Sequence, residues 1–513
     1  MDILHPCFEL ASAPAARHFD AMSAAGNHTL VTPAEMTAID ADAARSGIDS
    51  YGLMTSAGTA VSAAALRLYP GALRFVVLCG PGNNGGDGYI AAAALRDSGA
   101  DVDVHALGDP AALKGDAARA CTAFGTAVKP LADYAPTAGD VVVDALFGAG
   151  LSRPVPPEAA RVMRTVASQD LPVIAVDLPS GVDGRSGQVL GASFRARHTV
   201  TFVARKPGHL LMPGRMLCGT LEVFDIGIPG RILSARAGRL SANGPHLWRK
   251  YAFTLDPAAH KFKRGHLAVF SGGPLSTGAA RLSAIAGLRA GAGLVTIASP
   301  AAASQANASH LTAVMLKQIE GEDDLSQWLA DKRIGAFVLG PGFGDLQRAR
   351  QYALMLGSHK LVLDADGITA FKDDPGPLFK ACAKGETRLV MTPHDGEFAR
   401  LFPDIEADEA SSKVDRAIAA AKRSHGVIVY KGADTVIAAP DGRAAINTNA
   451  PPWLATAGSG DTLAGIIGAH LAQGMPAFEA AAAGVWRHGR AGAKAGEGLT
   501  AEDLAAAVEP LPA

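Results

Sequence analysis

Two glycine-rich turns hold the residues with the clearest chemical potential. The first is CGPGNNGGDGY, residues 79–89, and the second is AGSGDTLAG, residues 457–465. Each turn ends in an aspartate, Asp87 or Asp461, close to an expected helix start. Glycines let the backbone approach an anion closely, and the unpaired N–H groups of a helix start attract negative charge. The two turns therefore predict two phosphate-handling sites on one chain.

Polar side chains at neighbouring strand ends extend the first site. Asp144 ends the run VVVD, and Asp177 ends VIAVD just before LPSG, which supplies Ser180. Ligands of open parallel sheets bind at the carboxyl ends of the strands, so we expect these side chains to converge. Oxygen atoms of Asn84, Asp144 and Ser180 suit a hard cation. Asp177 then remains as the candidate for proton transfer. The alternative is that these aspartates only cap the following helices.

The second turn favours phosphoryl transfer. Backbone N–H groups of residues 457–460 would form an anion hole at the helix start. Asp461 would lie beside the transferred group and accept the proton of the attacking hydroxyl. The alternative for Asp461 is an ordinary carboxylate that stabilises the helix dipole.

Three further segments surround this second turn. Residues 431–435, KGADT, follow a strand and could contact nucleotide phosphates or ribose, while His394 in TPHDGE favours a ligand contact over a turn or core role. Asp364 and Asp366 in LDADG could cap a helix or help place a magnesium ion through water.

Apolar runs separated by helical lengths predict two parallel α/β units. We expect helices over residues 33–46 and 52–68, a hairpin around PDG at 440–442, and closing helices from Gly460 and near Ala477. The alternation of strands and helices breaks down at 227–260, which places the boundary between the two domains near residue 243. The predicted parts are an extension at 1–29 and domains at 30–243 and 244–513. The expected strands are 74–79, 102–107, 141–146, 172–178, 198–203 and 221–226, then 266–273, 294–300, 336–342, 361–367, 388–393 and 427–432.

Composition narrows the class of protein. With 513 residues, 48% hydrophobic and 19% charged, the chain is too long for one core and typical of a globular protein. A net charge of −2 gives no basic excess for nucleic acid. No apolar run is long enough to span a bilayer, and the N-terminus does not resemble a secretory signal. Five widely spaced cysteines without a CxxC pair favour a reducing compartment, so we expect a cytoplasmic protein without a membrane partner.

The motifs of the first half resemble a known family. GNNGGDGY, DALFGAGLSRPV, AVDLPSGVDG and TFVARKPG are similar to the NAD(P)H-hydrate epimerase domain over about residues 30–235. The resemblance implies a Rossmann-like three-layer α/β/α domain that interconverts the R and S forms of a hydrated nicotinamide nucleotide. It implies a potassium ion at Asn84, Asp144 and Ser180, with Asp177 at the substrate. The other implied substrate contacts are Asn83, Asn84, Gly85, Gly86, Asp87, Gly148, Ala149, Gly150, Leu151, Ser152, Arg153 and Pro154.

The second half resembles the ribokinase-like superfamily, and within it the ADP- or ATP-dependent NAD(P)H-hydrate dehydratase. VLGPGFGD, LDADG, MTPHDGEFARLF and YKGADT carry the match over about residues 245–510, and GAARL and LRAGAGLV fit this family better than sugar kinases. The resemblance implies hydrate contacts at Ala279, Gly342, His394 and Asp461. It implies nucleotide contacts at Lys431, Gly432, Ala433, Asp434, Thr435 and Gly460.

Together the halves resemble bifunctional enzymes that repair hydrated NADH and NADPH. Asp461 would accept the ring-hydroxyl proton, with Mg²⁺ and ADP as the first choice of donor and ATP as the alternative, releasing AMP or ADP and phosphate. We expect a homo-oligomer. Two alternatives stay open: a kinase for a vitamin precursor or sugar, or an N-terminal half that only binds ligands or dimerises, as similar domains do in RNA-processing scaffolds.

Overall fold

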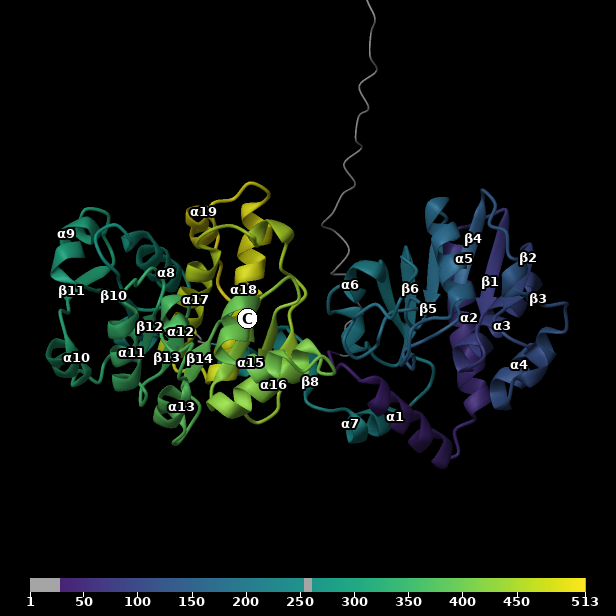
Figure 1. Cartoon of the computed structure of the whole chain (residues 1–513), viewed down its shortest axis with the longest axis horizontal. Coiled ribbons are helices and arrows are strands. Elements are labelled where there is room, and N and C mark those ends of the chain that lie inside the picture. Colours follow the sequence, from purple (N-terminus) through teal and green to yellow (C-terminus); the bar gives the residue numbers. More distant parts are fainter. Residues whose placement is uncertain (1–27, 253–260, 513) are drawn as a thin grey trace, which may run out of the picture.

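The computed structural model describes residues 28–252 and 261–512, which form two α/β domains that lie side by side (Figure 1). The N-terminal domain contains one parallel sheet of seven strands in the order β3-β2-β1-β4-β5-β6-β7. The strand order reverses between β1 and β4, which is where ligands bind in folds of this kind. The strands are β1 (Arg74–Cys79), β2 (Val102–Ala106), β3 (Lys129–Pro130), β4 (Asp140–Ala145), β5 (Val173–Val176), β6 (His198–Phe202) and β7 (Thr220–Phe224).

Both faces of this sheet are covered, because the strands alternate apolar side chains between two cores. Phe75, Val77 and Cys79 pack toward α2 and α3, whereas Val76 and Leu78 pack toward α5. The helices of this domain are α1 (Pro33–Arg45), α2 (Ser50–Leu68), α3 (Asn83–Asp97), α4 (Gly115–Phe124), α5 (Pro157–Ser168), α6 (Gly214–Leu217) and α7 (Gly230–Arg236).

The C-terminal domain is built on a sheet of ten strands in the order β11-β10-β9-β12-β13-β14-β15-β16-β17-β8. The strands from β11 to β15 are parallel, and β16 and β17 form the predicted antiparallel hairpin. The strands are β8 (Leu240–Ala242), β9 (His266–Phe270), β10 (Leu294–Ser299), β11 (Met315–Gln318), β12 (Ala336–Leu339), β13 (Leu361–Leu363), β14 (Leu389–Met391), β15 (Val427–Tyr430), β16 (Val436–Ala438) and β17 (Ala444–Ile446).

Helices cover both faces of the second sheet as well. One core packs under α11, α13, α14 and α16, and the other under α8, α17, α18 and α19. The longer helices are α8 (Thr277–Arg289), α9 (Ala301–Ala308), α10 (Glu322–Leu329), α11 (Leu346–Met355), α16 (Lys413–Ser424), α17 (Ser459–Ala472) and α18 (Ala477–Ala495). The shorter ones are α12 (Asp366–Thr369), α13 (Gly376–Cys382), α14 (Asp395–Leu401), α15 (Pro403–Glu406) and α19 (Ala501–Ala506).

Strand pairing moves the predicted domain boundary. The division after residue 243 assigned residues 240–242 to the first domain, but they form β8, which pairs in parallel with β17 of the second sheet. The reason is that β17 would otherwise leave its edge unpaired. The segment around Leu30 lies beside β8, because Leu30 N donates to Leu240 O. The next residue contacts the first domain, where Val31 N donates to Arg205 O. Of the predicted extension, residues 1–27 lie outside the described residues.

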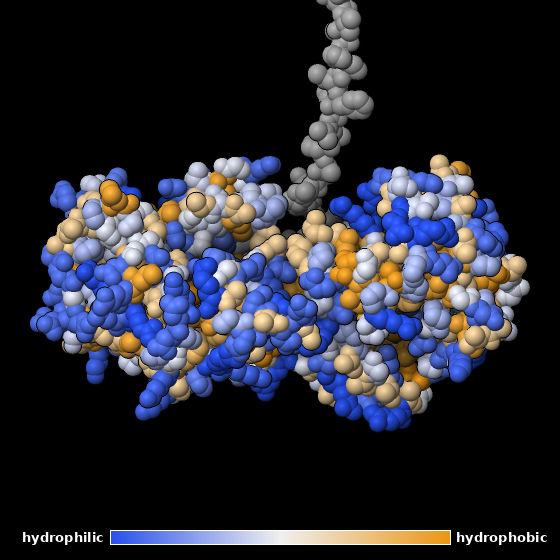
Figure 2. Space-filling model, in the orientation of Figure 1, coloured by the Kyte–Doolittle hydropathy of each residue, from blue (hydrophilic) through white to orange (hydrophobic). Residues whose placement is uncertain are grey.

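Predicted elements otherwise match closely, and every expected strand has a counterpart. The helix expected from about Asp87 begins earlier, at Asn83, because the glycine-rich turn continues directly into helical geometry. On the face shown in Figure 2, hydrophilic residues cover most of the surface and hydrophobic ones occur in scattered patches. Within the described residues, no helix is long and apolar enough to cross a membrane. The four cysteines in this part of the chain are free.

Candidate active sites

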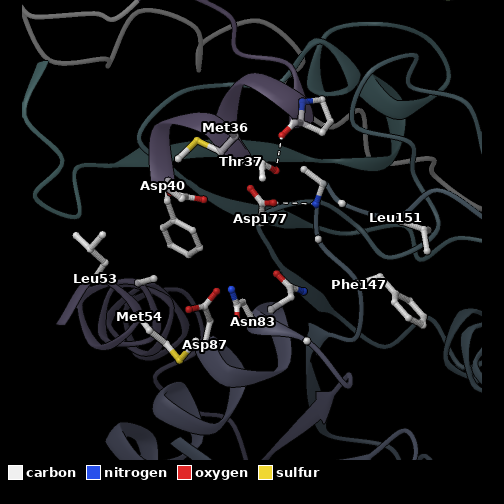
Figure 3. Close-up of a pocket in the computed structure, with 18 of the residues that line it drawn as sticks. Met36, Thr37, Asp40, Leu53, Met54, Asn83, Asp87, Phe147, Leu151 and Asp177 are labelled. Atoms are coloured by element: carbon white, nitrogen blue, oxygen red, sulfur yellow. Dashed lines mark hydrogen bonds between the residues drawn. The ribbon is translucent and has the colours of Figure 1, made fainter. Parts of the chain in front are cut away.

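The first site is a cavity of about 680 Å³ beside the carboxyl ends of β1, β4 and β5. Figure 3 shows the carboxylates of Asp40, Asp87 and Asp177 facing this cavity from α1, α3 and the loop after β5. Apolar side chains of the first two helices, among them Met36, Leu53 and Met54, close its other side. The result is a cavity with a wall of acids and a wall of apolar groups.

Glycine is required where the loops meet at the cavity floor. A Cβ on Gly148 would lie 2.8 Å from Asn84 Oδ1 and 2.9 Å from Asp177 Oδ2. A Cβ on Gly85 would lie 2.0 Å from Gly80 O, so the start of α3 packs directly on the end of β1. These close approaches bring residues 83–87, the 148–153 loop and Asp177 to one place, as the strand-end argument predicts.

Asp177 is held by three donors. Lys206 Nζ donates to Asp177 Oδ1 at 2.6 Å and Thr201 Oγ1 donates to the same oxygen at 2.9 Å, while Ala149 N donates to Oδ2 at 2.9 Å. Burial disfavours the charged form, but the Lys206 ammonium outweighs it and lowers the pKa of Asp177 to about 2. Asp177 is therefore a fixed anion, which makes it a weak proton carrier.

The other two carboxylates are in a different electrostatic state. Within the described part of the chain, neither Asp40 nor Asp87 forms a side-chain hydrogen bond or an ion pair. Burial, with the negative charges of Asp177 and Asp40, raises the pKa of Asp87 well above its usual range. Burial also raises the pKa of Asp40 to about 6, against the attraction of Lys206. A cavity with one fixed anion and a neutral carboxylic acid can both stabilise a cation and donate a proton.

The predicted cation ligands lie together beneath this cavity. Ser180 Oγ donates to Asp144 Oδ1 at 2.5 Å and Ser180 N donates to Asp144 Oδ2 at 2.7 Å. The Asn84 amide lies between Val176 O and Gly148 N. Asp144 is fully buried, which raises its pKa to about 6, and within residues 28–252 and 261–512 no cationic side chain pairs with it. Asn84, Asp144 and Ser180 thus place hard oxygen atoms next to one another, the donor type that hard cations prefer.

The structure brings most predicted contacts of the first site to the cavity wall. Asn83, Asn84, Asp87, Asp177 and residues 148–153 line it. Gly85 and Gly86 support the wall from behind, and Pro154 does not line it. Sequence reasoning missed Asp40 and Lys206, although Lys206 lies in the quoted TFVARKPG motif. Asp40 lies in a helical segment with two other acids, Glu35 and Asp42, and the sequence does not distinguish it from them.

The second site surrounds the start of α17. A Cβ on Gly460 would lie 3.4 Å from Lys431 Nζ and 3.5 Å from Asp364 Oδ2, so three elements converge at this point. Lys431 Nζ donates to Asp364 Oδ1 at 2.8 Å. Burial and the charge of Asp364 raise the pKa of Asp461 to about 6, while Lys431 opposes the shift. Asp461 is thus poised to exchange a proton near neutral pH.

His394 joins this cluster through Glu397. Its ring Nδ1 accepts from Gly396 N and caps α14, while Nε2 lies 3.6 Å from Glu397 Oε1. Glu397 Oε2 in turn lies 4.0 Å from Lys431 Nζ. The histidine therefore acts as a helix cap whose other face stays exposed, which is compatible with a ligand contact.

The remaining predicted hydrate contacts are adjacent to one another. A Cβ on Gly342 would lie 3.0 Å from Ala279 Cβ, and one on Gly272 would lie 2.0 Å from Gly342 O. Gly342 has φ +58°, in the region that favours glycine. The loops after β9 and β12 thus pack together where the strand order of the second sheet reverses.

Hydrogen bonds between its own residues close the predicted nucleotide loop, residues 431–435. Gly432 N donates to Thr435 Oγ1 at 3.2 Å and Thr435 Oγ1 donates to Gly432 O at 2.8 Å. The Asp434 carboxylate accepts from Lys413 Nζ and from Met212 N of the N-terminal domain. The side chain of Asp434 therefore shapes the loop, and Lys431 is the member that faces the site.

The fold and the two residue clusters define an α/β protein with two candidate active sites, one at the first sheet's strand ends and one at the start of α17. Comparison with known proteins gives the family. Residues 267–509 match the family described as NAD(P)H-hydrate dehydratase, and residues 50–208 match the one described as YjeF-related protein N-terminus.

Whole-length relatives carry the same two parts. The chain is 34% identical over 497 residues to the bifunctional NAD(P)H-hydrate repair enzyme Nnr of Moorella thermoacetica, covering 91% of this chain and 92% of that protein. It is also 34% identical to the protein of the same name from Escherichia coli, covering 87% and 85%. The chain belongs to the family of bifunctional NAD(P)H-hydrate repair enzymes. A solved ADP/ATP-dependent NAD(P)H-hydrate dehydratase from Bacillus subtilis aligns at 24% identity and a TM-score of 0.42, covering 51% of this chain and 94% of that one.

Proposed function

We propose that this chain repairs hydrated NADH and NADPH in two steps, epimerisation in the N-terminal domain and nucleotide-dependent dehydration of the S form in the C-terminal domain. The observation that carries the proposal is the pairing of the two sites. One brings Asp87 and the Lys206-paired Asp177 to the same cavity, and the other holds Asp461 beside Lys431 at a helix start. These are the groups that the two reactions require.

Epimerisation exchanges the hydroxyl on a ring carbon bonded to nitrogen. The Asp87 carboxyl donates its proton to the hydroxyl oxygen, the C–O bond breaks with its electron pair, and water leaves. The ring-nitrogen lone pair forms the C=N⁺ bond, and the fixed anion of Asp177 stabilises this cation. Water then adds to either face and returns a proton to Asp87. We assign the proton to Asp87 rather than to Asp177 because three donors already occupy the Asp177 carboxylate.

Dehydration needs a better leaving group than hydroxide. Asp461 accepts the proton of the S hydroxyl as that oxygen attacks the terminal phosphoryl group of ADP or ATP. Lys431 and the N–H groups at the start of α17 neutralise the developing charge. Phosphate then leaves with the C–O electron pair, the neighbouring ring carbon loses a proton, and the dihydropyridine is restored. The other products are AMP from ADP or ADP from ATP.

Two ions complete the proposal. Asn84, Asp144 and Ser180 would hold K⁺, whose charge would compensate the buried Asp144 carboxylate and brace the loops beside Asp177. Asp364 and Asp366 would hold Mg²⁺ through water at the second site, where the ion would neutralise nucleotide phosphates. We further propose a cytoplasmic homo-oligomer that acts on small molecules and takes neither nucleic acid nor membrane as a partner.

The test uses a hydrate prepared as both epimers, purified full-length protein, Mg²⁺ and either ADP or ATP. Recovery of dihydronicotinamide absorbance is followed over time. Recovery of both epimers faster than the spontaneous exchange supports both activities. Recovery limited to the S fraction contradicts the epimerase assignment, and no recovery with either nucleotide overturns the dehydratase assignment. A stable phosphorylated vitamin precursor or sugar in place of hydrate turnover would support a kinase instead.

A further inference from the structure

One chain segment, residues 206–215, touches both candidate sites. Its first residue is Lys206, the ion-pair partner of Asp177 in the first site. Its last residues reach the predicted nucleotide loop of the second domain. Figure 1 shows α6, which begins at the end of this segment, on the side of the N-terminal domain that faces the C-terminal domain. We call residues 206–215 the connecting segment.

The connecting segment is anchored firmly on the epimerase side. Lys206 N donates to His209 Nδ1 at 2.9 Å, and His209 Nε2 lies 2.8 Å from Asp177 O. A Cβ on Gly208 would lie 2.4 Å from Asp183 O, so the segment packs too closely on the 183–184 backbone for any side chain at this position. The start of the segment and the backbone of Asp177 therefore form one unit.

Two buried leucines of the connecting segment pack in the core of the C-terminal domain. Leu210 is 5% exposed and Leu211 fully buried, and both belong to the core that packs under α14 and α16 of the C-terminal domain. Burial of this apolar surface fixes the position of the segment relative to the second sheet.

The end of the segment holds the nucleotide loop. Met212 N donates to Asp434 Oδ2 at 2.9 Å, and Lys413 Nζ donates to the other oxygen at 2.6 Å. Arg215 Nη1 donates to Ala433 O at 3.2 Å, and its Nη2 donates to Thr448 O at 2.6 Å. The N-terminal domain thus supplies a guanidinium and a backbone N–H to a loop of the other domain, next to Lys431.

We propose that Arg215 is a positioning residue for the dehydratase, through which the epimerase domain sets nucleotide affinity. The inference rests on the proposed function, because it takes residues 431–435 as the nucleotide loop. A loop held in its binding conformation loses less freedom when the nucleotide binds, so its affinity is higher. Among the described residues, Arg215 bonds to the carbonyls of Ala433 and Thr448 and not to Asp461, so we expect the chemical step itself not to depend on it.

The experiment compares three full-length variants. Arg215→Ala removes both bonds, Arg215→Lys can keep one, and Arg239→Ala removes a different contact to the C-terminal domain, Arg239 Nη1 to Asp441 O at 3.2 Å. We measure nucleotide KM and kcat with the S hydrate, direct binding of ADP and ATP by calorimetry, and epimer exchange. Loss of a hydrogen bond to a charged group corresponds to about a tenfold effect. We therefore expect Arg215→Ala to raise nucleotide KM and Kd by roughly tenfold with kcat and epimer exchange unchanged.

The controls separate a positioning role from a general docking role. Arg215→Lys should give an intermediate KM, and Arg239→Ala should match the wild type. Unchanged nucleotide KM and Kd in Arg215→Ala would overturn the proposal, and so would equal losses in nucleotide affinity and epimer exchange. If the wild-type protein binds nucleotide without dehydrating the hydrate, the proposed function fails while the binding data still decide the role of Arg215. If the wild type binds neither ADP nor ATP, both fail.

Discussion

Lys206 Nζ lies 2.6 Å from Asp177 Oδ1 in a pair that is almost entirely buried on the lysine side. The partners come from different strand ends, after β5 and after β6. The pair shapes the charge pattern of the first site, because Lys206 lowers the pKa of Asp177, whereas burial raises the pKa values of Asp40 and Asp87.

Replacing the fixed anion should slow epimerisation alone. Asp177→Asn keeps the shape of the side chain but removes the charge that stabilises the cationic intermediate. We expect epimer exchange to fall by about 10²-fold or more, on the scale of a lost electrostatic contact to a transition state. Dehydration of the pure S hydrate should stay at the wild-type rate. Exchange is measured by chromatographic separation of the epimers, and a wild-type exchange rate would remove Asp177 from the mechanism.

The proton donor can be identified by comparing two acids. Asp87→Asn is isosteric but cannot donate the required proton, so we expect epimer exchange to fall by roughly 10²–10⁴-fold. Asp40→Asn should cost less, because Asp40 lies on α1 and is exposed to solvent. Both variants are assayed for exchange and for unfolding temperature. A larger loss in Asp40→Asn than in Asp87→Asn would transfer the donor role to Asp40.

Removing the base of the second site should strongly slow dehydration. Asp461→Asn should lower kcat with the S hydrate by about 10²–10⁴-fold, the usual contribution of a general base. ADP and ATP binding and epimer exchange should remain, because the start of α17 and the first domain are unchanged. Calorimetry and the exchange assay provide these controls, and dehydration at the wild-type rate would exclude Asp461 as the proton acceptor.

Dehydration should depend on pH in a direction fixed by Asp461. The base must be ionised, and burial with the charge of Asp364 raises its pKa to about 6. The rate should therefore be low below that pH, rise through it and level off above it. Asp364→Asn removes the repulsion and frees Lys431, so the midpoint should move to lower pH. Rapid-mixing measurements at saturating nucleotide give the profile, and a rate that falls with rising pH would contradict this role.

A matched pair of glycine substitutions tests the packing of the first turn. Gly85→Ala places a methyl group 2.0 Å from Gly80 O, whereas Gly82→Ala meets nothing within 4 Å. Overpacking costs about 1–3 kcal/mol, so Gly85→Ala should lower the unfolding temperature and slow epimer exchange. Gly82→Ala should have a much smaller effect on both. Equal unfolding temperatures for the two variants would contradict the close packing of α3 on β1.

The regular elements could be predicted because their signals are local. Apolar runs such as residues 74–79 and 141–146 become neighbouring strands, and PDG becomes the turn between β16 and β17. The pairing of residues 240–242, next to the boundary predicted near residue 243, could not be predicted, for a different reason. Residues 240–242 are too few to show an apolar periodicity. They form a strand because they pair with the free edge of β17, some two hundred residues later in the chain.

The candidate sites likewise contain residues that the sequence could predict and residues that it could not. Asp87, Asp177 and Asp461 stood out because each follows a strand or a glycine turn, a feature visible in a short stretch of sequence. Asp40 and Lys206 did not, because their importance depends on the side chains that face them from other elements. Asp434 was expected at a ligand, yet its carboxylate binds Met212 N of the other domain.

By itself, then, the sequence determined two parallel α/β units, two glycine turns at helix starts and the acids that lie at strand ends, because backbone sterics and apolar periodicity act over a few residues. The tertiary structure decided which of those acids has a lowered pKa, which have raised ones, and that the Asp434 carboxylate is taken up by Lys413 and Met212. It also decided that the segment from Lys206 to Arg215 touches both sites. These properties depend on burial and on charges brought close by folding, and such distances are not encoded in the spacing of residues along the chain.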